Sequence, residues 1–139
     1  MCSKTNNVSD ETVVEKTFAE RVAEARIAVP AISPREARAA RDREPTTLFI
    51  DPRDAAGIAA TTGMIPGAIN VPLAVLDAAN EAALPEELAA KGRPIITACQ
   101  AGPMGALAAH ALKRRGFENV CFVDGGTQGW LDAGYPTER

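Results

Sequence analysis

The sequence contains no long hydrophobic run. Its apolar stretches fall far short of the ~20 residues that a helix needs to cross a bilayer. The first residues, MCSKTNNVSDET, are polar and do not contain the apolar segment of a leader peptide. We therefore expect a cytoplasmic protein with no membrane partner.

The sequence also lacks a positive charge excess and any metal-type cysteine spacing. Its 15 Lys and Arg residues against 18 Asp and Glu give a net charge of -3, which disfavours nucleic acid as a partner. Cys2, Cys99 and Cys121 form no Cys-x-x-Cys pair, so neither a zinc site nor a disulfide framework is predicted. A glycine fingerprint for phosphate binding is missing too, and we expect no metal and no organic cofactor.

The 139 residues suit one globular domain behind an N-terminal extension. We predict the extension over residues 1–28 and the domain over 29–139. Thr12 and Glu15 fit a capping box, and the pattern behind them predicts an amphipathic helix from about 12 to 27. The apolar stripe of that helix is Val14, Phe18, Val22 and Ala25. The stripe is typical of a helix that covers the domain's own core, and docking on a partner, such as a second copy in a homodimer, is the alternative.

Strand and helix patterns alternate along the domain. Strands are predicted at 29–32, 48–51, within 65–72, at 94–98 and at 120–123, and helices at 34–41, 55–60, 73–79, 85–90, 105–115 and 128–131. Ser33, Pro34 and Glu36 provide the N-cap, the first-turn proline and the capping-box glutamate of the helix at 34–41. Such alternation is typical of an α/β domain with a mostly parallel sheet covered on both faces. Ligands of these folds bind at the carboxyl ends of the strands, where Asp51 and Cys99 both fall.

Cys99 stands where a predicted strand gives way to a helix. The loop behind it consists of Gln100, Ala101, Gly102, Pro103, Met104 and Gly105. Backbone amides of such a loop, together with the helix N-terminus, stabilise a thiolate and equally a persulfide anion or an oxyanion. The local sequence fits a small buried hydrophobic residue just as well.

Five motifs follow one another around this loop. They are Ile50-Asp51-Pro52-Arg53, the segment GMIPGAINVP from Gly63 to Pro72, the cysteine loop, the segment GFENV from Gly116 to Val120, and Asp124-Gly125-Gly126 with Trp130. Their order, from about Ile32 to Trp130, resembles the rhodanese family. The resemblance implies a five-stranded parallel sheet with helices on both faces. It also implies that Cys99 accepts sulfane sulfur from thiosulfate, or from a low-molecular or protein persulfide, and passes it as a persulfide to a thiol or cyanide-type acceptor.

The sequence departs from that family at two places. Many active loops carry arginine after the cysteine and near the loop's end, where this chain has Gln100 and Met104. Stabilisation of an anion then rests on backbone amides, with support from Arg53, and the apolar loop mouth favours a persulfide donor over thiosulfate. Asp51 and Arg53 are expected to form an ion pair that orients their turn, with a substrate contact by Arg53 as the alternative. Met64 replaces a frequent histidine and is expected to pack.

Two other functions remain as alternatives. A cysteine phosphatase or arsenate reductase needs an arginine in the loop, which this loop lacks. A non-enzymatic sulfur carrier or regulatory module would instead dock a partner.

His110 lies about 16 Å along the helix from Cys99 and is expected at the surface, and Cys121 is expected to be buried and inert. The sulfurtransferase hypothesis requires an accessible Cys99 with amides aimed at its sulfur.

Overall fold

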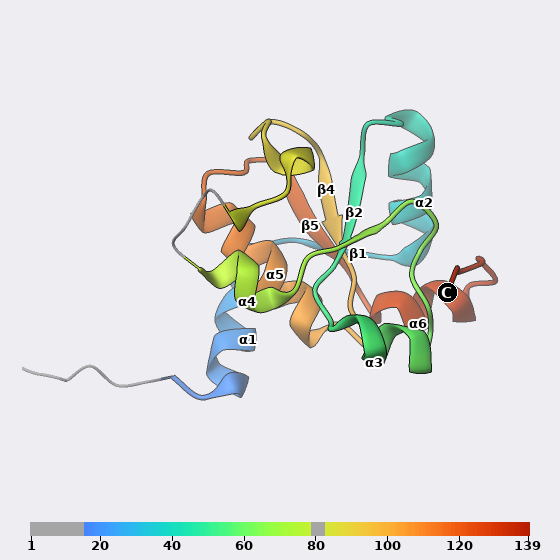
Figure 1. The fold of residues 1–139 in the computed structure, drawn as a ribbon, viewed down its shortest axis with the longest axis horizontal. Coiled ribbons are helices and arrows are strands. Elements are labelled where there is room, and N and C mark those ends of the chain that lie inside the picture. The colour runs from blue at the N-terminus through green and yellow to red at the C-terminus, as the bar shows by residue number, and fades with distance from the viewer. Residues whose placement is uncertain (1–15, 79–82) are drawn as a thin grey trace, which may run out of the picture.

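The computed structural model describes residues 16–78 and 83–139, and within them five parallel strands form one sheet of order β1-β5-β4-β2-β3 (Figure 1). The strands are β1 (Ala31–Ile32), β2 (Leu48–Asp51), β3 (Ile69–Asn70), β4 (Ile95–Thr97) and β5 (Val120–Val123). The helices are α1 (Phe18–Ala28), α2 (Pro34–Arg43), α3 (Ala55–Ala60), α4 (Leu73–Asp77), α5 (Pro103–Arg114) and α6 (Gly126–Asp132), with a 3-10 turn η2 at Glu86–Leu88. The predicted α/β fold with a five-stranded parallel sheet is confirmed.

Two apolar clusters cover the two faces of this sheet. The cluster under α1, α4 and α5 includes Ile50, Ile95, Leu112, Phe117 and Phe122. The cluster under α2 and α6 includes Phe49, Ile96, Val123 and Trp130. In the second cluster the Trp130 ring stands edge-on to Phe49, with 5.8 Å between the ring centroids. Burial on both faces explains why the strands are continuous apolar runs in the sequence.

The start of α2 follows its sequence signals closely. The Ser33 hydroxyl accepts a hydrogen bond from the Glu36 amide, and the Glu36 carboxylate accepts one from the Ser33 amide at 2.8 Å. Pro34 takes the first helical position, where it sacrifices no hydrogen bond. The predicted capping box is confirmed, and the helix runs to Arg43, slightly beyond the predicted end.

The N-terminal helix begins later than predicted. Its N-cap is Thr17, whose hydroxyl accepts a hydrogen bond from the Glu20 amide in a second capping box. The Thr12 and Glu15 box lies outside the described residues, but Lys16 and Thr17 precede the helix, so the start predicted at residue 12 is wrong. The capping box at Thr17 sets the start at Phe18.

Only the second half of the predicted apolar stripe on α1 is buried. Ala25 is fully buried, and Val22 and Ala28 pack against the core. Phe18 keeps 56% of its surface exposed, so its expected place in the stripe is wrong, and Val14 lies outside the described residues. The helix therefore covers the domain's own core along α5.

Two helices begin earlier than their predicted starts. Pro103 fits the first position of α5, and Gly126 opens α6 directly behind the turn at Gly125. In a sequence, glycine and proline indicate turns. For this reason the sequence predicts the starts of α5 and α6 about two residues too late. None of the helices in residues 16–78 and 83–139 is long and apolar enough to cross a membrane.

The Ser33 cap provides a test of how α2 is anchored. We expect Ser33→Ala to lower the free energy of unfolding by about 1 kcal/mol, because the Glu36 amide loses its acceptor. Urea unfolding measures this difference. Ser33→Asp, which keeps an acceptor at the N-cap, should retain wild-type stability, and an equal loss in both variants would contradict the role of the cap.

Candidate functional site

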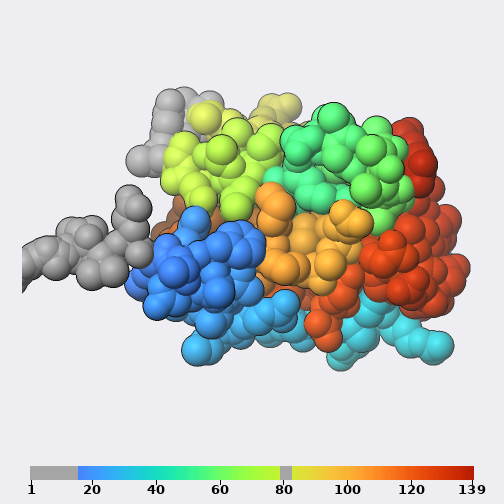
Figure 2. Space-filling model, turned by 90° about the horizontal axis from the view of Figure 1, so that it is seen from below, coloured from blue at the N-terminus to red at the C-terminus, as the bar shows by residue number. Residues whose placement is uncertain are grey.

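Cys99 lies at the carboxyl edge of the sheet, just beyond the end of β4. Residues 98–102 form a short loop between β4 and α5. Figure 2 views this edge, with the orange of this loop and the start of α5 surrounded by α1 in blue, the segments around α3 and α4 in green, and α6 in red. The cysteine loop therefore sits at the position where open parallel sheets bind their ligands.

The first turn of α6 fixes the backbone of this loop. The Thr127 amide donates to the Cys99 carbonyl at 2.7 Å, and the Gln128 amide donates to the Gln100 carbonyl at 3.0 Å. In a trans peptide the N–H points away from the C=O. The N–H groups that follow these two carbonyls, those of Gln100 and Ala101, therefore point away from α6.

Gly126 makes this close approach possible. A Cβ on Gly126 would lie 2.5 Å from the Cys99 carbonyl oxygen and 2.8 Å from the carbonyl carbon of Gln100. The residue also has a φ of +63°, which side chains rarely adopt. The motif Asp124-Gly125-Gly126 thus belongs to the site through its backbone, because only glycine lets α6 pack against the cysteine loop.

The sulfur of Cys99 receives a hydrogen bond from the loop. The Gly102 amide lies 3.0 Å from Sγ. Among the described residues, no acceptor is found for the amides of Ala101, Met104 and Gly105, and the last two belong to the first turn of α5. The helix N-terminus adds a positive partial charge. Backbone donors are thus available for an anion carried on this sulfur.

Cys99 is buried, with 3% of the residue exposed, so the expectation of an accessible Cys99 is wrong, whereas the expected backbone amide at its sulfur is present. The Gly102 amide lies against Sγ, and Gly102 itself has a φ of +126°, a conformation that favours glycine. Gln100 and Ala101 are exposed on the outside of the loop. With so little of the residue exposed, a bulky donor reaches the sulfur only if part of this loop moves.

Asp51 and Arg53 form a buried ion pair at the end of β2. Arg53 Nη2 lies 2.7 Å from Asp51 Oδ2, and Nε lies 3.0 Å from Oδ1, which makes the pair bidentate. Nη1 also donates to the Thr61 hydroxyl, and Nη2 lies within hydrogen-bond distance of the Thr62 hydroxyl and the Gly63 carbonyl as well. These contacts orient the turn after β2, and a substrate contact by Arg53 would have to break them.

Polar residues that we did not predict also hold this edge together. The side-chain amide of Asn70 donates through Nδ2 to the backbone carbonyls of Asp51 and Arg53, at 2.9 and 2.6 Å. The Thr97 hydroxyl donates to the Gly105 carbonyl at 2.6 Å and ties β4 to the first turn of α5. The sequence indicates a structural role for both positions, because a polar residue inside or beside an apolar strand needs a hydrogen-bond partner.

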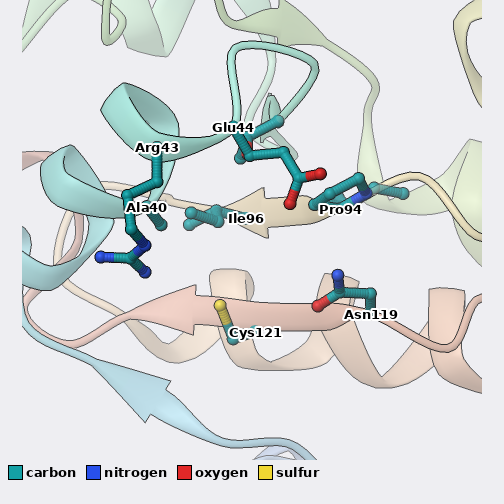
Figure 3. Close-up of a pocket in the computed structure, with 9 residues that line it drawn as sticks. Ala40, Arg43, Glu44, Pro94, Ile96, Asn119 and Cys121 are labelled. Atoms are coloured by element: carbon teal, nitrogen blue, oxygen red, sulfur yellow. The ribbon is translucent and has the colours of Figure 1, made fainter.

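Cys121 lies on β5 and lines a hollow of about 170 Å³ at the opposite edge of the sheet, beside the end of α2 (Figure 3). The thiol is half-buried and points toward Ala40 and Ile96 in that view. Burial, together with the Glu36 carboxylate, raises the pKa of the Cys121 thiol to about 11. Cys121 therefore remains a neutral thiol at physiological pH, at the sheet edge away from Cys99.

His110, expected at the surface, is half-buried on α5, where burial and Arg114 lower its pKa.

A family model described as rhodanese-like domain matches residues 33–133. The chain belongs to the rhodanese-like domain family. The resemblance in motif order is thereby confirmed. In the part of the chain that the structure describes, no cluster of His, Cys, Asp and Glu is arranged to hold a metal ion.

Solved structures of rhodanese-like proteins share the fold. A rhodanese-like domain from Anabaena sp. is 27% identical, with a TM-score of 0.63 and coverage of 78% of each chain. A polysulfide-sulfur transferase homodimer from Wolinella succinogenes is 24% identical, with a TM-score of 0.71 over 87% of this chain and 86% of that one. A protein from Rhodopseudomonas palustris, described as a possible tyrosine phosphatase, is 22% identical, with a TM-score of 0.78 over 91% of this chain and 97% of that one. The last two likenesses concern the fold alone.

The close approach at Gly126 yields a prediction with a matched control. Gly116→Ala strains a positive φ of +97° in open space and should cost about 1 kcal/mol of unfolding free energy. Gly126→Ala adds the collision with the Cys99 and Gln100 carbonyls and should cost clearly more, as measured by urea unfolding. Equal costs for the two variants would show that α6 does not constrain the cysteine loop.

The raised pKa of Cys121 predicts its reactivity. With a pKa of about 11, roughly one thiol in a thousand is ionised at pH 8, because each pH unit below the pKa reduces the thiolate tenfold. Alkylation of Cys121 by iodoacetamide, followed by peptide mass spectrometry in a Cys99→Ser background, should be about 100-fold slower at pH 8 than in urea-unfolded protein. Its rate should rise about tenfold per pH unit between pH 7 and 9. A rate that is fast and independent of pH would refute this.

Proposed function

We propose that the protein is a sulfurtransferase that carries sulfane sulfur as a persulfide on Cys99. The observation that supports this most directly is the Gly102 amide 3.0 Å from Sγ, in a loop that has further amides without acceptors. An amide donor at the sulfur stabilises the thiolate before loading and the terminal persulfide anion afterwards. Membership of the rhodanese-like family supports the same chemistry.

Loading is a displacement at sulfur. The Cys99 thiolate attacks the outer sulfur of the donor, the new Sγ–S bond forms, and the S–S bond of the donor breaks with its electron pair on the leaving group. With thiosulfate the leaving group is sulfite, and with a low-molecular or protein persulfide it is a thiolate. The step transfers a sulfur atom and needs no external oxidant or reductant.

Discharge repeats the same displacement with the roles reversed. A thiolate or cyanide acceptor attacks the outer sulfur of the persulfide, and the Sγ–S bond breaks to return the Cys99 thiolate. The products are a new persulfide or thiocyanate. The Gly102 amide stabilises the thiolate as it leaves, because it already donates to Sγ in the unloaded loop.

The burial of Cys99 favours a second candidate, a non-enzymatic sulfur carrier or regulatory module. With 3% of the residue exposed, a bulky acceptor reaches the sulfur only if the loop opens, and a docked partner protein is a natural means of opening it. Such a module would accept sulfur and hold it, with poor turnover on small molecules.

Phosphatase or arsenate reductase chemistry has no corresponding support in the loop. Those reactions need a guanidinium that clamps the oxyanion. Residues 99–105 contain no arginine, and Arg53 is held by Asp51 and by hydrogen bonds to Thr61, Thr62 and Gly63.

Mass spectrometry of the intact protein tests the proposal. After incubation with thiosulfate, or with glutathione persulfide, the wild type should gain one sulfur, about 32 Da, that cyanide removes. Cys99→Ser should gain none, and Cys121→Ser should behave as wild type. Loading without turnover in a cyanide or thiol assay would support the carrier. A wild type that gains no sulfur from either donor would refute both the sulfurtransferase and the sulfur carrier, and would leave the regulatory binding module as the remaining candidate.

A further inference from the structure

We propose that Arg26, in the last turn of α1, is the residue that gives the Cys99 loop its preference for anionic sulfur donors. This inference rests on the proposed function and deepens it, because it names the substrate class. The loop itself has no basic residue between Cys99 and Gly105. The N-terminal helix α1 places a basic residue, Arg26, beside this loop.

The geometry places the Arg26 guanidinium beside the residue that contacts the sulfur. A Cβ built on Gly102 would lie 3.5 Å from Arg26 Nη2. The amide of the same Gly102 donates to Cys99 Sγ at 3.0 Å. An anion that approaches this sulfur from the side of α1 therefore meets the guanidinium and the loop amides together.

Two contacts hold Arg26 in this place. Its Cζ atom lies 5.5 Å from the centre of the Phe122 ring, which is buried at the carboxyl end of β5. The helix that carries it packs along α5, and Figure 2 shows the blue atoms of α1 directly beside the orange of the cysteine loop. The aromatic contact orients the guanidinium but leaves its N–H groups available.

The charge of Arg26 is also uncompensated. The residue is exposed, and among residues 16–78 and 83–139 no carboxylate lies within ion-pair distance of it. By contrast, Arg21 on the same helix pairs with Asp77, and Arg53 pairs with Asp51. Unlike Arg21 and Arg53, Arg26 thus has an open charge beside the Cys99 loop.

Arg26 stands outside the segment that matches the family model, residues 33–133. The absence of arginine from the loop therefore does not remove cationic help from the site, because an element outside that segment supplies it. If Arg26 only complemented the dipole of α1, the affinity of the loop for anions would not depend on it.

The test measures anion binding separately from sulfur transfer. In a Cys99→Ser background thiosulfate has no thiolate to load, so its binding is followed by NMR through the amide shifts of Gly102 and its neighbours. We expect Arg26→Ala to raise the dissociation constant about fivefold at low salt, and Arg26→Lys to restore part of the affinity. The matched control is Arg35→Ala, which removes the same charge from the exposed first turn of α2.

The second readout is the steady-state rate of sulfur transfer, measured in protein that retains Cys99. Thiosulfate is a dianion and an arenethiosulfonate a monoanion, and each offers one sulfane sulfur with sulfite or sulfinate as the leaving group. Arg26→Ala should lower kcat/KM for thiosulfate about fivefold and for the arenethiosulfonate about twofold, with the larger part of the loss in KM.

The inference is overturned if Arg26→Ala binds thiosulfate as tightly as its parent, or if Arg35→Ala loses as much affinity. Neither result depends on whether Cys99 forms a persulfide. Failure of the proposed function would appear separately, as wild-type protein that gains no sulfur in the mass spectrometer.

Discussion

The shape of the Cys99 loop depends on the two hydrogen bonds that the first amides of α6 donate to the carbonyls of Cys99 and Gln100. These bonds occupy the carbonyls of Cys99 and Gln100 on the side of α6, and the N–H groups of Gln100 and Ala101 therefore point to the opposite side. A loop with free carbonyls near the sulfur would repel a thiolate or a persulfide. Gly126 is the condition for this arrangement, since a single Cβ would displace the Cys99 carbonyl.

The sheet order places α6 where it can make these bonds. Strands β4 and β5 are neighbours, with Thr97 opposite Phe122, so the segment after β5 lies beside the segment after β4. Strand β2 flanks β4 on the other side, and its end is held by the buried pair of Asp51 and Arg53. The charges of this pair neutralise each other, whereas Arg26 on α1 carries an open charge beside the Cys99 loop.

Much of the fold could be predicted from local signals in the sequence. Short apolar runs identified the strands, and the Ser33 capping box identified α2, because both depend on residues close in the chain. The position of Cys99 at a strand end followed in the same way. Its burial did not, because burial depends on how the loop and the elements around it pack in three dimensions. The place of Arg26 was equally hidden, since it depends on how α1 packs along α5.

Backbone amides of the loop are proposed to stabilise a persulfide on Cys99. A crystal structure of the protein after loading with a sulfane sulfur donor is the direct test of this stabilisation. We expect a second sulfur atom bonded to Cys99 Sγ, within hydrogen-bond distance of a backbone N–H of Gln100, Ala101, Gly102, Met104 or Gly105, with the α6 hydrogen bonds intact. Additional sulfur on Cys121, or a loaded Cys99 whose outer sulfur contacts no loop amide, would contradict it.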